Sequence, residues 1–374
     1  MEASAVLKGQ PIYRRARAVG INPNHWYPVF WADQLNPGDV VPAKIWETSL
    51  VVYRDAEGTV HAMADACPHK GVELHQGEVH GNNLVCPYHG WEFNSDGQCV
   101  GIPYFPKKQK LPCAQARVYP TREAYGIVWV FPGATELAEQ KPLPDVPQYG
   151  QPGWFMVRIP GHFQAHFSIC NENTMDVFHG FLHKDLQGWY DPKLLKLKQD
   201  DDGVAADYQV SYEGFLSKLL GLGTKGSDST TRTVSIHYHY PHYATSLESV
   251  SSLYLMRLPV GPTETKSFSL MFLKLPLPQW LLNGPLSRLL EKVILNNIFL
   301  KFLHQDVEMM ESEQRNYSID PQRDYVEVNP AIIALQRVIV AQYERSDVSH
   351  TSSFEASKES SIQPSQEVSD GMLV

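Results

Sequence analysis

Two short segments, each with one cysteine and one histidine, constrain this 374-residue chain more than any other feature. The first reads Cys-Pro-His-Lys-Gly over residues 67–71, and the second reads Cys-Pro-Tyr-His-Gly-Trp over residues 86–91. Thiolates and imidazoles are metal ligands, and prolines and glycines favour tight turns. The sequence therefore predicts a pair of ligand-bearing hairpins within a β-rich fold.

The order of the ligands separates two kinds of metal site. Structural zinc sites normally pair cysteine with cysteine at one end and histidine with histidine at the other. Here Cys67 is followed by His69 and Cys86 by His89, so each segment supplies one sulfur and one nitrogen. A Rieske [2Fe–2S] cluster needs such a mixed set, with sulfur on one iron and nitrogen on the other. We predict this cluster; a zinc-bound interaction module with the same ligands is the alternative.

Composition and charge limit the partners and the compartment. The formal net charge is −9, whereas nucleic-acid binding needs a concentrated basic surface, so we expect no nucleic-acid partner. The other three of the five cysteines, Cys99, Cys113 and Cys170, have no neighbouring ligand residue. We expect free thiols in a reducing compartment, the cytoplasm. Because no run of about 18 apolar residues occurs, we expect a soluble chain or one in peripheral contact with a membrane.

The order of expected elements divides the chain into an all-β domain and an α+β domain. Short β-rich runs separated by turn residues occupy residues 26–66, and a last such run lies at 126–131. Beyond a stretch rich in proline, glycine and charge, helical and strand-like segments mix. The predicted organisation is an N-terminal arm at 1–24, an all-β domain at 25–135, a linker at 136–153, an α+β domain at 154–345 and a disordered tail at 346–374.

The second domain is expected to hold two helices and an antiparallel sheet. The helices are expected at about 168–182 and 285–316, and the strands at 204–212, 233–243, 247–258 and 264–275. The glycine- and serine-rich residues 221–229 are expected to form a mobile loop. The apolar run at 275–282 is expected to pack in the core, with substrate access or membrane contact as the alternative.

At the two Cys/His segments the sequence resembles a known family. Residues 25–131 resemble the Rieske domain of ring-hydroxylating and related oxygenases, and Cys-Pro-Tyr-His-Gly-Trp-Glu-Phe at 86–93 is similar to the family's second cluster loop. The resemblance implies that the two cysteines bind one iron and the two histidines the other. It also implies that the histidine edges face an electron acceptor.

A second group of ligand residues lies in the first expected helix of the second domain. Asp176, His179 and His183 fall at i, i+3 and i+7, so they share one face of a helix. Two histidines and one carboxylate can bind ferrous iron as an open facial triad that leaves positions for O2. Histidines that only pack in a core or lie on a surface are the alternative.

The same segment resembles the family's Asn-x-x-Asp-x-x-His-x(4)-His motif. It matches at Asn173, Asp176 and His179, but three residues rather than four separate His179 from His183. The resemblance implies that His179 and His183 bind the mononuclear iron. It also implies that Asn173 and Asp176 act at the site without binding iron, and that Asp176 bridges an iron-binding histidine to a cluster histidine of a neighbouring subunit.

The third iron ligand is expected from the long helix. Asp306 continues an apolar stripe that includes Phe299, Phe302 and Leu303, so it faces inward, and residues 304–308 resemble the family's C-terminal ligand motif. A solvated acid on a charged helix is the alternative. Two further groups of residues bear on the site. His237 and His239 share a strand face that we expect to pack in the sheet rather than to bind metal, and the residues expected near a substrate cavity are Phe163, His166, Leu253, Leu255 and Met271.

Over the second domain the resemblance is to the branch that contains vanillate demethylase-like, chlorophyllide a oxygenase-like and pheophorbide a oxygenase-like enzymes. It implies a helix-grip-like α+β catalytic domain and a homotrimer that places one subunit's cluster near the next subunit's iron. It also implies an oxygenase component that uses O2 to hydroxylate or oxidatively demethylate a hydrophobic ring substrate. Because the chain has no flavin or nicotinamide signature, electrons are expected from an NAD(P)H-dependent reductase, with or without a ferredoxin. A Rieske electron carrier without catalysis is the alternative.

Overall fold

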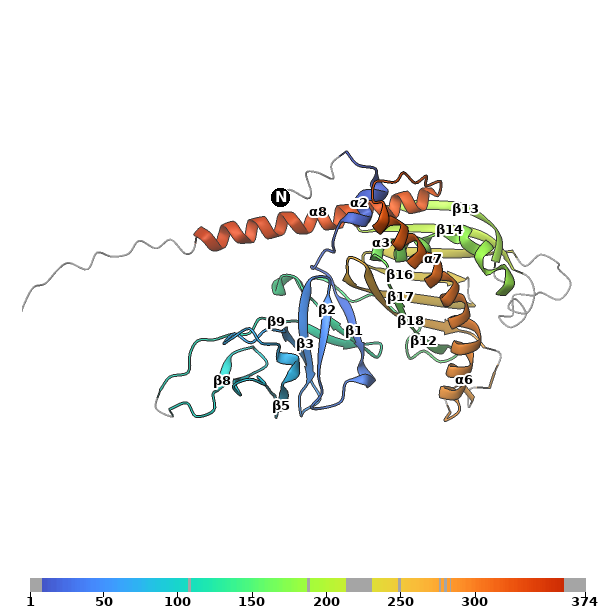
Figure 1. The fold of residues 1–374 in the computed structure, drawn as a ribbon. Helices are drawn as coiled ribbons and strands as arrows, with labels where there is room; N and C mark the ends of the chain where they lie inside the picture. The colour runs from blue at the N-terminus through green and yellow to red at the C-terminus, as the bar shows by residue number, and fades with distance from the viewer. Residues whose placement is uncertain are drawn as a thin grey trace, which may run out of the picture.

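The structure is a computed structural model. It describes residues 9–106, 109–186, 189–212, 231–247, 250–275, 277–278, 281–282 and 284–359, and for 347–359 it describes the backbone alone. The expected mobile loop at 221–229 lies outside these ranges. Figure 1 shows a β-rich N-terminal domain beside a larger domain in which helices cover a sheet. The architecture confirms the predicted fold class, an all-β domain followed by an α+β domain.

Three small antiparallel sheets form the N-terminal domain. Their strand orders are β1-β11-β10, β2-β3-β4-β9 and β5-β6-β7-β8. The strands are β1 (Tyr27–Trp31), β2 (Val40–Ile45), β3 (Thr48–Arg54), β4 (Val60–Ala64), β5 (Glu78–His80), β6 (Asn83–Val85), β7 (Glu92–Phe93), β8 (Cys99–Gly101), β9 (Val118–Tyr119), β10 (Thr121–Ala124) and β11 (Ile127–Val130). Buried β-branched and aromatic side chains such as Val51, Tyr53 and Trp129 hold the sheets together.

A seven-stranded antiparallel sheet in the order β12-β18-β17-β16-β15-β14-β13 forms the second domain. Its strands are β12 (Phe155–Phe163), β13 (Trp189–Gln199), β14 (Gly203–Tyr212), β15 (Thr231–His239), β16 (His242–Leu247), β17 (Ser251–Gly261) and β18 (Glu264–Leu273). The four predicted strands correspond to β14, β15, β17 and β18, whereas β16 and the two edge strands β12 and β13 were not predicted. In β13 buried and exposed residues do not alternate regularly, which weakens its signal in a sequence, whereas β12 does alternate and was missed all the same.

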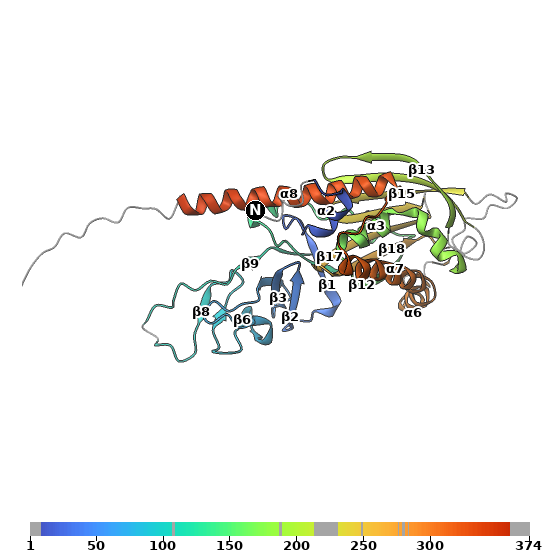
Figure 2. The same cartoon turned by 45° about the horizontal axis from the view of Figure 1, so that its top comes forward.

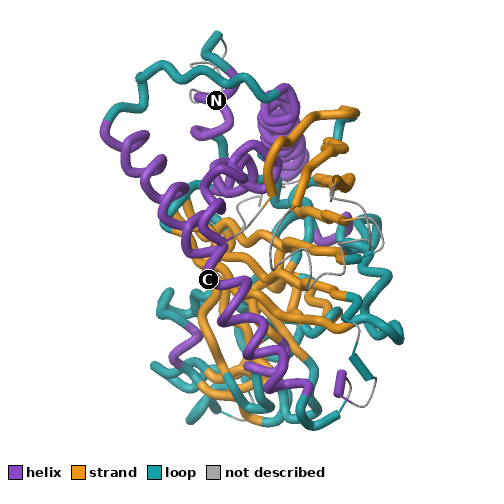
Figure 3. Tube along the Cα trace, turned by 90° about the vertical axis from the view of Figure 1, so that its right-hand side faces the viewer, coloured by secondary structure: helices purple, strands orange, loops and turns teal. Residues whose placement is uncertain are grey.

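One face of this sheet carries the helices, and we call it the inner face. Directly paired residues on neighbouring strands define it: Ile236, Thr245, Leu253, Met271 and Val157. The helical elements outside the N-terminal domain pack against the strands or, like α2, against other helices. They are α2 (Ile12–Ala18), α3 (Phe167–Met175), the 3-10 segment η4 (Val177–Leu186), α6 (Ser287–Ile294), the π-helical turn η5 (Leu295–Phe299), α7 (Leu300–Ile319) and α8 (Pro330–Glu359). Figure 3 shows α7, η5 and α6 as one helical segment that runs across the strands.

The first helix of the second domain is shorter than predicted. The sequence predicts one helix over 168–182, but α3 ends at Met175, and residues 177–186 form 3-10 turns. Asp176 is the break, because its backbone is extended and its Oδ1 accepts a hydrogen bond from the backbone N–H of Phe178 at 3.0 Å. Aspartate side chains compete in this way with helical hydrogen bonds. Asp176, His179 and His183 therefore do not share one α-helical face.

The C-terminal region also differs from the prediction. The backbone of α8 continues to Glu359, so the predicted disorder does not begin at Ser346; residues 360–374 lie outside the described ranges. The helix begins after Asn329, whose Oδ1 accepts a hydrogen bond from the N–H of Ala331 at 3.0 Å, with Pro330 as the first helical residue. Figure 2 shows α8 passing α2 and α3 and extending beyond the sheet. Among the described residues, no helix is long and apolar enough to cross a membrane.

Candidate metal centres and substrate cavity

The two Cys/His segments form a pair of loops with the same backbone hydrogen bonds. In the first, the N–H of Gly71 donates to the carbonyl of Cys67 at 2.7 Å, and the N–H of Cys67 donates to the carbonyl of Val72 at 2.8 Å. In the second, Gly90 and Cys86 repeat the first bond at 3.1 Å, and the N–H of Cys86 donates to Trp91 at 2.8 Å. Both glycines have positive φ, at 74° and 67°, which other residues rarely adopt. Each loop therefore depends on a glycine four residues after its cysteine.

The loops place their cysteines inside the domain and their histidines at its edge. Cys67 and Cys86 are free and buried in one apolar cluster. Burial, together with the neighbouring thiol of Cys86, raises the pKa of the Cys67 thiol to about 11. A thiol in such a place ionises when a metal binds it. Two adjacent buried thiols thus suit the sulfur-ligated iron of a [2Fe–2S] cluster.

The imidazoles of the two loops lie together. The ring centroids of His69 and His89 are 4.7 Å apart, Trp91 stacks on His69 at 4.4 Å, and Tyr88 packs on His89 at 3.8 Å. His69 Nδ1 is buried and has no hydrogen-bond partner among the described residues, whereas the side chain of His89 is exposed. A buried nitrogen without a partner is the geometry expected of a metal ligand. The predicted ligand set is therefore gathered in one place, with one side open to solvent.

A second group of ligand atoms lies between η4 and α7. His183 Nε2 is 3.3 Å and His179 Nε2 is 3.8 Å from Asp306 Oδ1. One ligand atom from each of the three residues lies within 4.8 Å of the others, and within the described ranges no other group of three ligand residues does so. Ligand atoms about 2 Å from one metal ion lie roughly 3 Å apart, so these residues fit a single ion. The shortened spacing to His183 is accommodated by the 3-10 turns.

Neighbouring side chains orient the triad of His179, His183 and Asp306. His183 Nδ1 shares a hydrogen bond with Gln305 Oε1 at 2.8 Å, which leaves Nε2 toward Asp306. Burial alone would lower the pKa of His183, but its hydrogen bond to Asp306 and the charge of that carboxylate raise the pKa. Asn173 Nδ2 donates to Asp306 Oδ1 at 3.4 Å. Metal-binding histidines usually have such a partner on the second nitrogen, which sets their tautomer.

Trp189 forms one wall of the triad and was not predicted to take part. Its Nε1 donates to the carbonyl of Val177 at 2.6 Å, and its ring lies about 5 Å from the rings of His179 and His183. A Cβ at Gly180 would lie 2.6 Å from Trp189 Nε1, so only glycine permits this approach. Gly180, between the two histidines, is the sequence signal for this close contact, but the sequence alone does not show that Trp189 makes it.

Asp176 lies beside the triad and outside it. Its Oδ1 accepts hydrogen bonds from the N–H of Phe178 and from Asn329 Nδ2, at 3.0 and 3.3 Å. Together with His179 it borders a polar depression of about 290 Å³, which we call the outer depression. The outer depression is also lined by Tyr13, Arg17, Glu172, Asn173, Glu313 and Tyr325. Asp176 therefore lies between the triad and the surface of the chain. This is the position that the predicted bridge to a neighbouring subunit requires.

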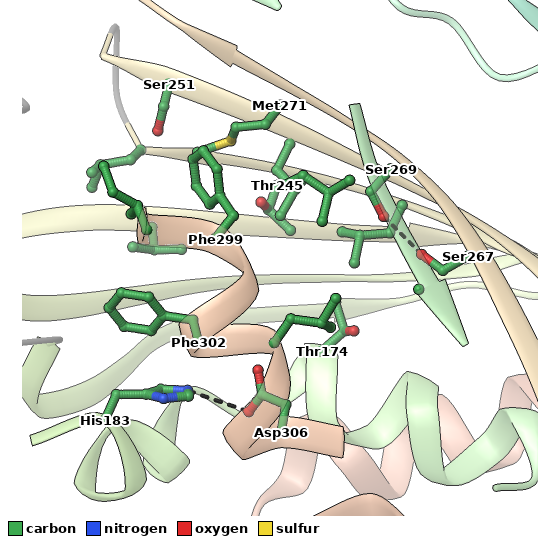
Figure 4. Close-up of a pocket in the computed structure, with 18 of the residues that line it drawn as sticks. Thr174, His183, Thr245, Ser251, Ser267, Ser269, Met271, Phe299, Phe302 and Asp306 are labelled. Atoms are coloured by element: carbon green, nitrogen blue, oxygen red, sulfur yellow. Dashed lines mark hydrogen bonds and ion pairs between the residues drawn. The ribbon is translucent and has the colours of Figure 1, made fainter. Parts of the chain in front are cut away.

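A largely apolar cavity of about 500 Å³ separates α7 from the inner face of the sheet. Figure 4 shows His183 and Asp306 at one end of it, below Phe302, with Met271 and Ser251 at the other. Of the residues expected near a cavity, Phe163, Leu253, Leu255 and Met271 line it. His166 does not; its buried ring bonds to the carbonyl of Val19 at 3.1 Å. His237 and His239 are exposed on the outer face of β15.

Comparisons with known proteins agree with this arrangement. Residues 25–120 match the family model described as Rieske [2Fe-2S] domain. The chain is 34% identical to a 4beta-methylsterol monooxygenase of Methylococcus capsulatus over 89% of this chain and 91% of the relative, and 28% identical to a chlorophyllide a oxygenase of Oryza sativa subsp. japonica over 70% and 51%. Its fold matches a crystal structure of dicamba monooxygenase with a TM-score of 0.70 at 20% identity, over 87% of this chain and 98% of the other.

Proposed function

The chain belongs to the family of Rieske-type non-haem iron oxygenases, and we propose that it hydroxylates or oxidatively demethylates a hydrophobic ring substrate. As a member of this family it is an oxygenase that carries a [2Fe–2S] cluster and a mononuclear iron. We assign the cluster to Cys67, His69, Cys86 and His89. His179, His183 and Asp306 are the proposed ligands of the mononuclear iron. The zinc module and the electron carrier without catalysis are set aside, because neither explains the triad at the end of the cavity.

One observation supports this function above the others. Two imidazoles and one carboxylate meet at the end of a cavity whose volume, about 500 Å³, lies within the range of small-molecule sites. When bound there, ferrous iron supplies the chemistry of O2 activation. The apolar walls bind the substrate rings and exclude water, while Gln305 and Asn173 hold the ligand side chains in place. An oxygenase needs such a cavity to bind its substrate beside the iron, whereas a simple electron carrier does not.

The reaction needs electrons that the chain does not generate. Insertion of one oxygen atom into a C–H bond, with the other leaving as water, consumes two electrons and two protons. We propose that an NAD(P)H-dependent reductase delivers the electrons to the cluster, directly or through a ferredoxin. The acidic chain, with net charge −9, suits a basic surface on that donor.

We propose that three copies of the chain form a ring. Figure 1 shows the cluster loops, near β5 and β8, at the end of the N-terminal domain that is remote from α7. Within one chain the cluster and the triad are thus far apart, and the outer depression offers a neighbour's cluster a place beside Asp176. Light scattering that gave a monomer as the active form would contradict this assembly.

Substrate class is proposed from the cavity and from the relatives. The cavity walls are mostly apolar, with leucine the most frequent residue, and the sterol and chlorophyllide named for two relatives are bulky ring compounds. The test is turnover of a panel of ring compounds by the iron-loaded protein with a surrogate reductase and isotopically labelled O2. We expect a product that carries one labelled oxygen atom. Reduction of the cluster without any oxygenated product across the panel would contradict the function.

We further propose that α6 touches an anionic membrane surface. Its inward residues Leu290 and Ile294 line the cavity, while Leu289 and Val293 are exposed to solvent near the basic Lys292. Apolar residues flanked by basic ones are typical of helices that lie in a lipid interface. A cytoplasmic protein that met a membrane in this way would take an apolar substrate from the bilayer into the cavity. We propose the cytoplasm because five cysteines are an odd number for a disulfide framework.

A further inference from the structure

Arg257 is a buried cation that lines the cavity. It lies on β17 opposite Ser267 of β18, and 3% of it is exposed. Its Nη2 donates to Thr174 Oγ1 at 2.7 Å and to the carbonyl of Cys170 at 3.1 Å. Its Nε is buried and has no hydrogen-bond partner among the described residues. One of the three guanidinium nitrogens is thus enough to tie β17 to α3.

Within the part of the chain that the structure describes, no carboxylate lies at ion-pair distance from Arg257. The charge of Asp306, whose carboxylate pairs with His179 and His183, favours the cation from farther away. The ring of Phe163 lies 5.2 Å from Cζ. Burial of an unpaired charge is costly, and burial lowers the pKa of this guanidinium. An anion in direct contact would stabilise such a cation, and the described residues place none at ion-pair distance.

The position of Arg257 relative to the triad indicates where that anion lies. Thr174, which holds the guanidinium, follows Asn173, which contacts Asp306. The hydroxyls of Ser267 and Ser269, also in the cavity, are 2.7 Å apart and satisfy each other. Among the described residues that line the cavity, two buried nitrogens have no hydrogen-bond partner: His179 Nδ1, on a proposed iron ligand, and Arg257 Nε. Of the two residues, only Arg257 carries a permanent positive charge.

We propose that Arg257 binds a carboxylate of the substrate. The substrate would then be an apolar ring acid, with its carboxylate at Arg257 near the triad and its rings along the inner face of the sheet. This inference rests on the proposed function, because it takes the cavity as the substrate site. It adds to the proposed function a specificity residue and a charged end for the ring substrate. A neutral ring compound held by apolar contacts alone would leave Arg257 unpaired.

The test measures binding, which does not require turnover. Dehydroabietic acid, a fused-ring carboxylic acid, and its primary amide have the same shape but differ in charge at neutral pH. Equilibrium dialysis against the anaerobic, iron-loaded protein gives the affinity of each. A charge-assisted pair in an apolar site predicts that the acid binds on the order of tenfold or more tightly than the amide. Equal affinities in the wild-type protein would overturn the proposal, whatever the variants do.

Three variants test whether Arg257 causes the preference for the acid over the amide. Arg257→Gln should bind acid and amide equally, whereas Arg257→Lys, which keeps the charge, should retain a preference for the acid. Arg323→Gln is the matched control, because it removes an exposed arginine that pairs only loosely with Asp320, at 3.8 Å. A preference that persisted in Arg257→Gln would contradict the assignment. If Arg257→Gln did not fold, the wild-type protein and Arg257→Lys would still test the proposal. Loss of the preference for the acid in Arg257→Lys would contradict a subsite that depends on charge.

Binding and turnover separate this inference from the proposed function. A clear preference for the acid, with no oxygenated product from any ring compound, would uphold the subsite and reject the reaction. Oxygenated products from neutral rings, with equal binding of acid and amide, would uphold the reaction and reject the subsite.

Discussion

Replacement of His183 tests the proposed mononuclear iron site most directly, because the spacing to His179 departs from the family motif. In His183→Ala, Asp306 loses a partner at 3.3 Å and Gln305 loses one at 2.8 Å. A triad that loses one of three protein ligands should bind iron at least on the order of 100-fold more weakly, since changes to residues behind the ligands already cost 10- to 100-fold. Iron per chain should fall from about three to about two, the pair held by the cluster.

The assay counts iron against acid-labile sulfide in the same sample, so that loss of the cluster is not mistaken for loss of the third iron. We expect the sulfide content and the cluster absorbance to be unchanged, because the four proposed cluster ligands belong to the other domain. His237→Ala is the matched control, since His237 is exposed on the outer face of β15 and should keep all of the iron. His183→Ala should also unfold more easily, by about 1–3 kcal/mol, because Gln305 loses its hydrogen bond.

A second variant separates a metal ligand from a merely structural histidine. Gln305→Leu keeps His183 but removes the partner of Nδ1, so iron affinity should fall about 10- to 100-fold while binding survives at high iron. A His183→Ala protein that retained its third iron and its turnover would refute the reasoning. In that case the 3.3 Å contact with Asp306 is an ion pair of the fold and not part of a metal site.

Four further predictions concern other parts of the chain. Cys67→Ser should remove the cluster, its colour and its labile sulfide; stoichiometric zinc in the wild-type protein would instead reject the cluster ligands. Asp176→Asn should keep the cluster, the iron and the melting temperature, yet lower turnover by on the order of 100-fold, and near wild-type turnover would reject the bridge. Burial raises the pKa of Glu172 to about 7 despite its pair with Arg17, so wild-type stability should fall by up to about 3 kcal/mol as pH rises from 4.5 through 7. Glu172→Gln should flatten that loss, and equal pH profiles in thermal melts would contradict it. Leu289→Glu should abolish sedimentation with vesicles of phosphatidylcholine and phosphatidylglycerol, whereas Leu195→Glu, at an exposed leucine of β13, should not.

The cluster loops show what local sequence determines. Each needs a cysteine, a histidine two or three residues later and a glycine at the fourth position, and all the hydrogen bonds that close each loop join residues at most five apart. Short-range spacing therefore carried the prediction of this ligand set. The inward direction of Asp306 was likewise predictable, because it depends on the period of one helix.

The geometry of the triad, in contrast, does not follow from short-range spacing. Asp176 ends α3 by bonding to the backbone of Phe178, so a helix that periodicity extended to residue 182 changes to 3-10 turns. Trp189 and Gln305 then hold the two histidines from β13 and α7. Hydrophobic periodicity does not show whether the N–H of Phe178 bonds to the side chain of Asp176 or continues the helix. It therefore could not predict the change to 3-10 turns.

From the sequence by itself came the two-domain order, the cluster loops and the residues of the triad, because each depends on spacing or period within a short segment. Only the tertiary structure decided how His179, His183 and Asp306 meet, since the last comes from a helix more than 120 residues away. It also decided that Arg257 lies buried at the cavity with no carboxylate of the described residues at ion-pair distance. In the sequence Arg257 is one arginine within a strand. Its environment comes from β18, α3 and the cavity, which contacts between distant segments create.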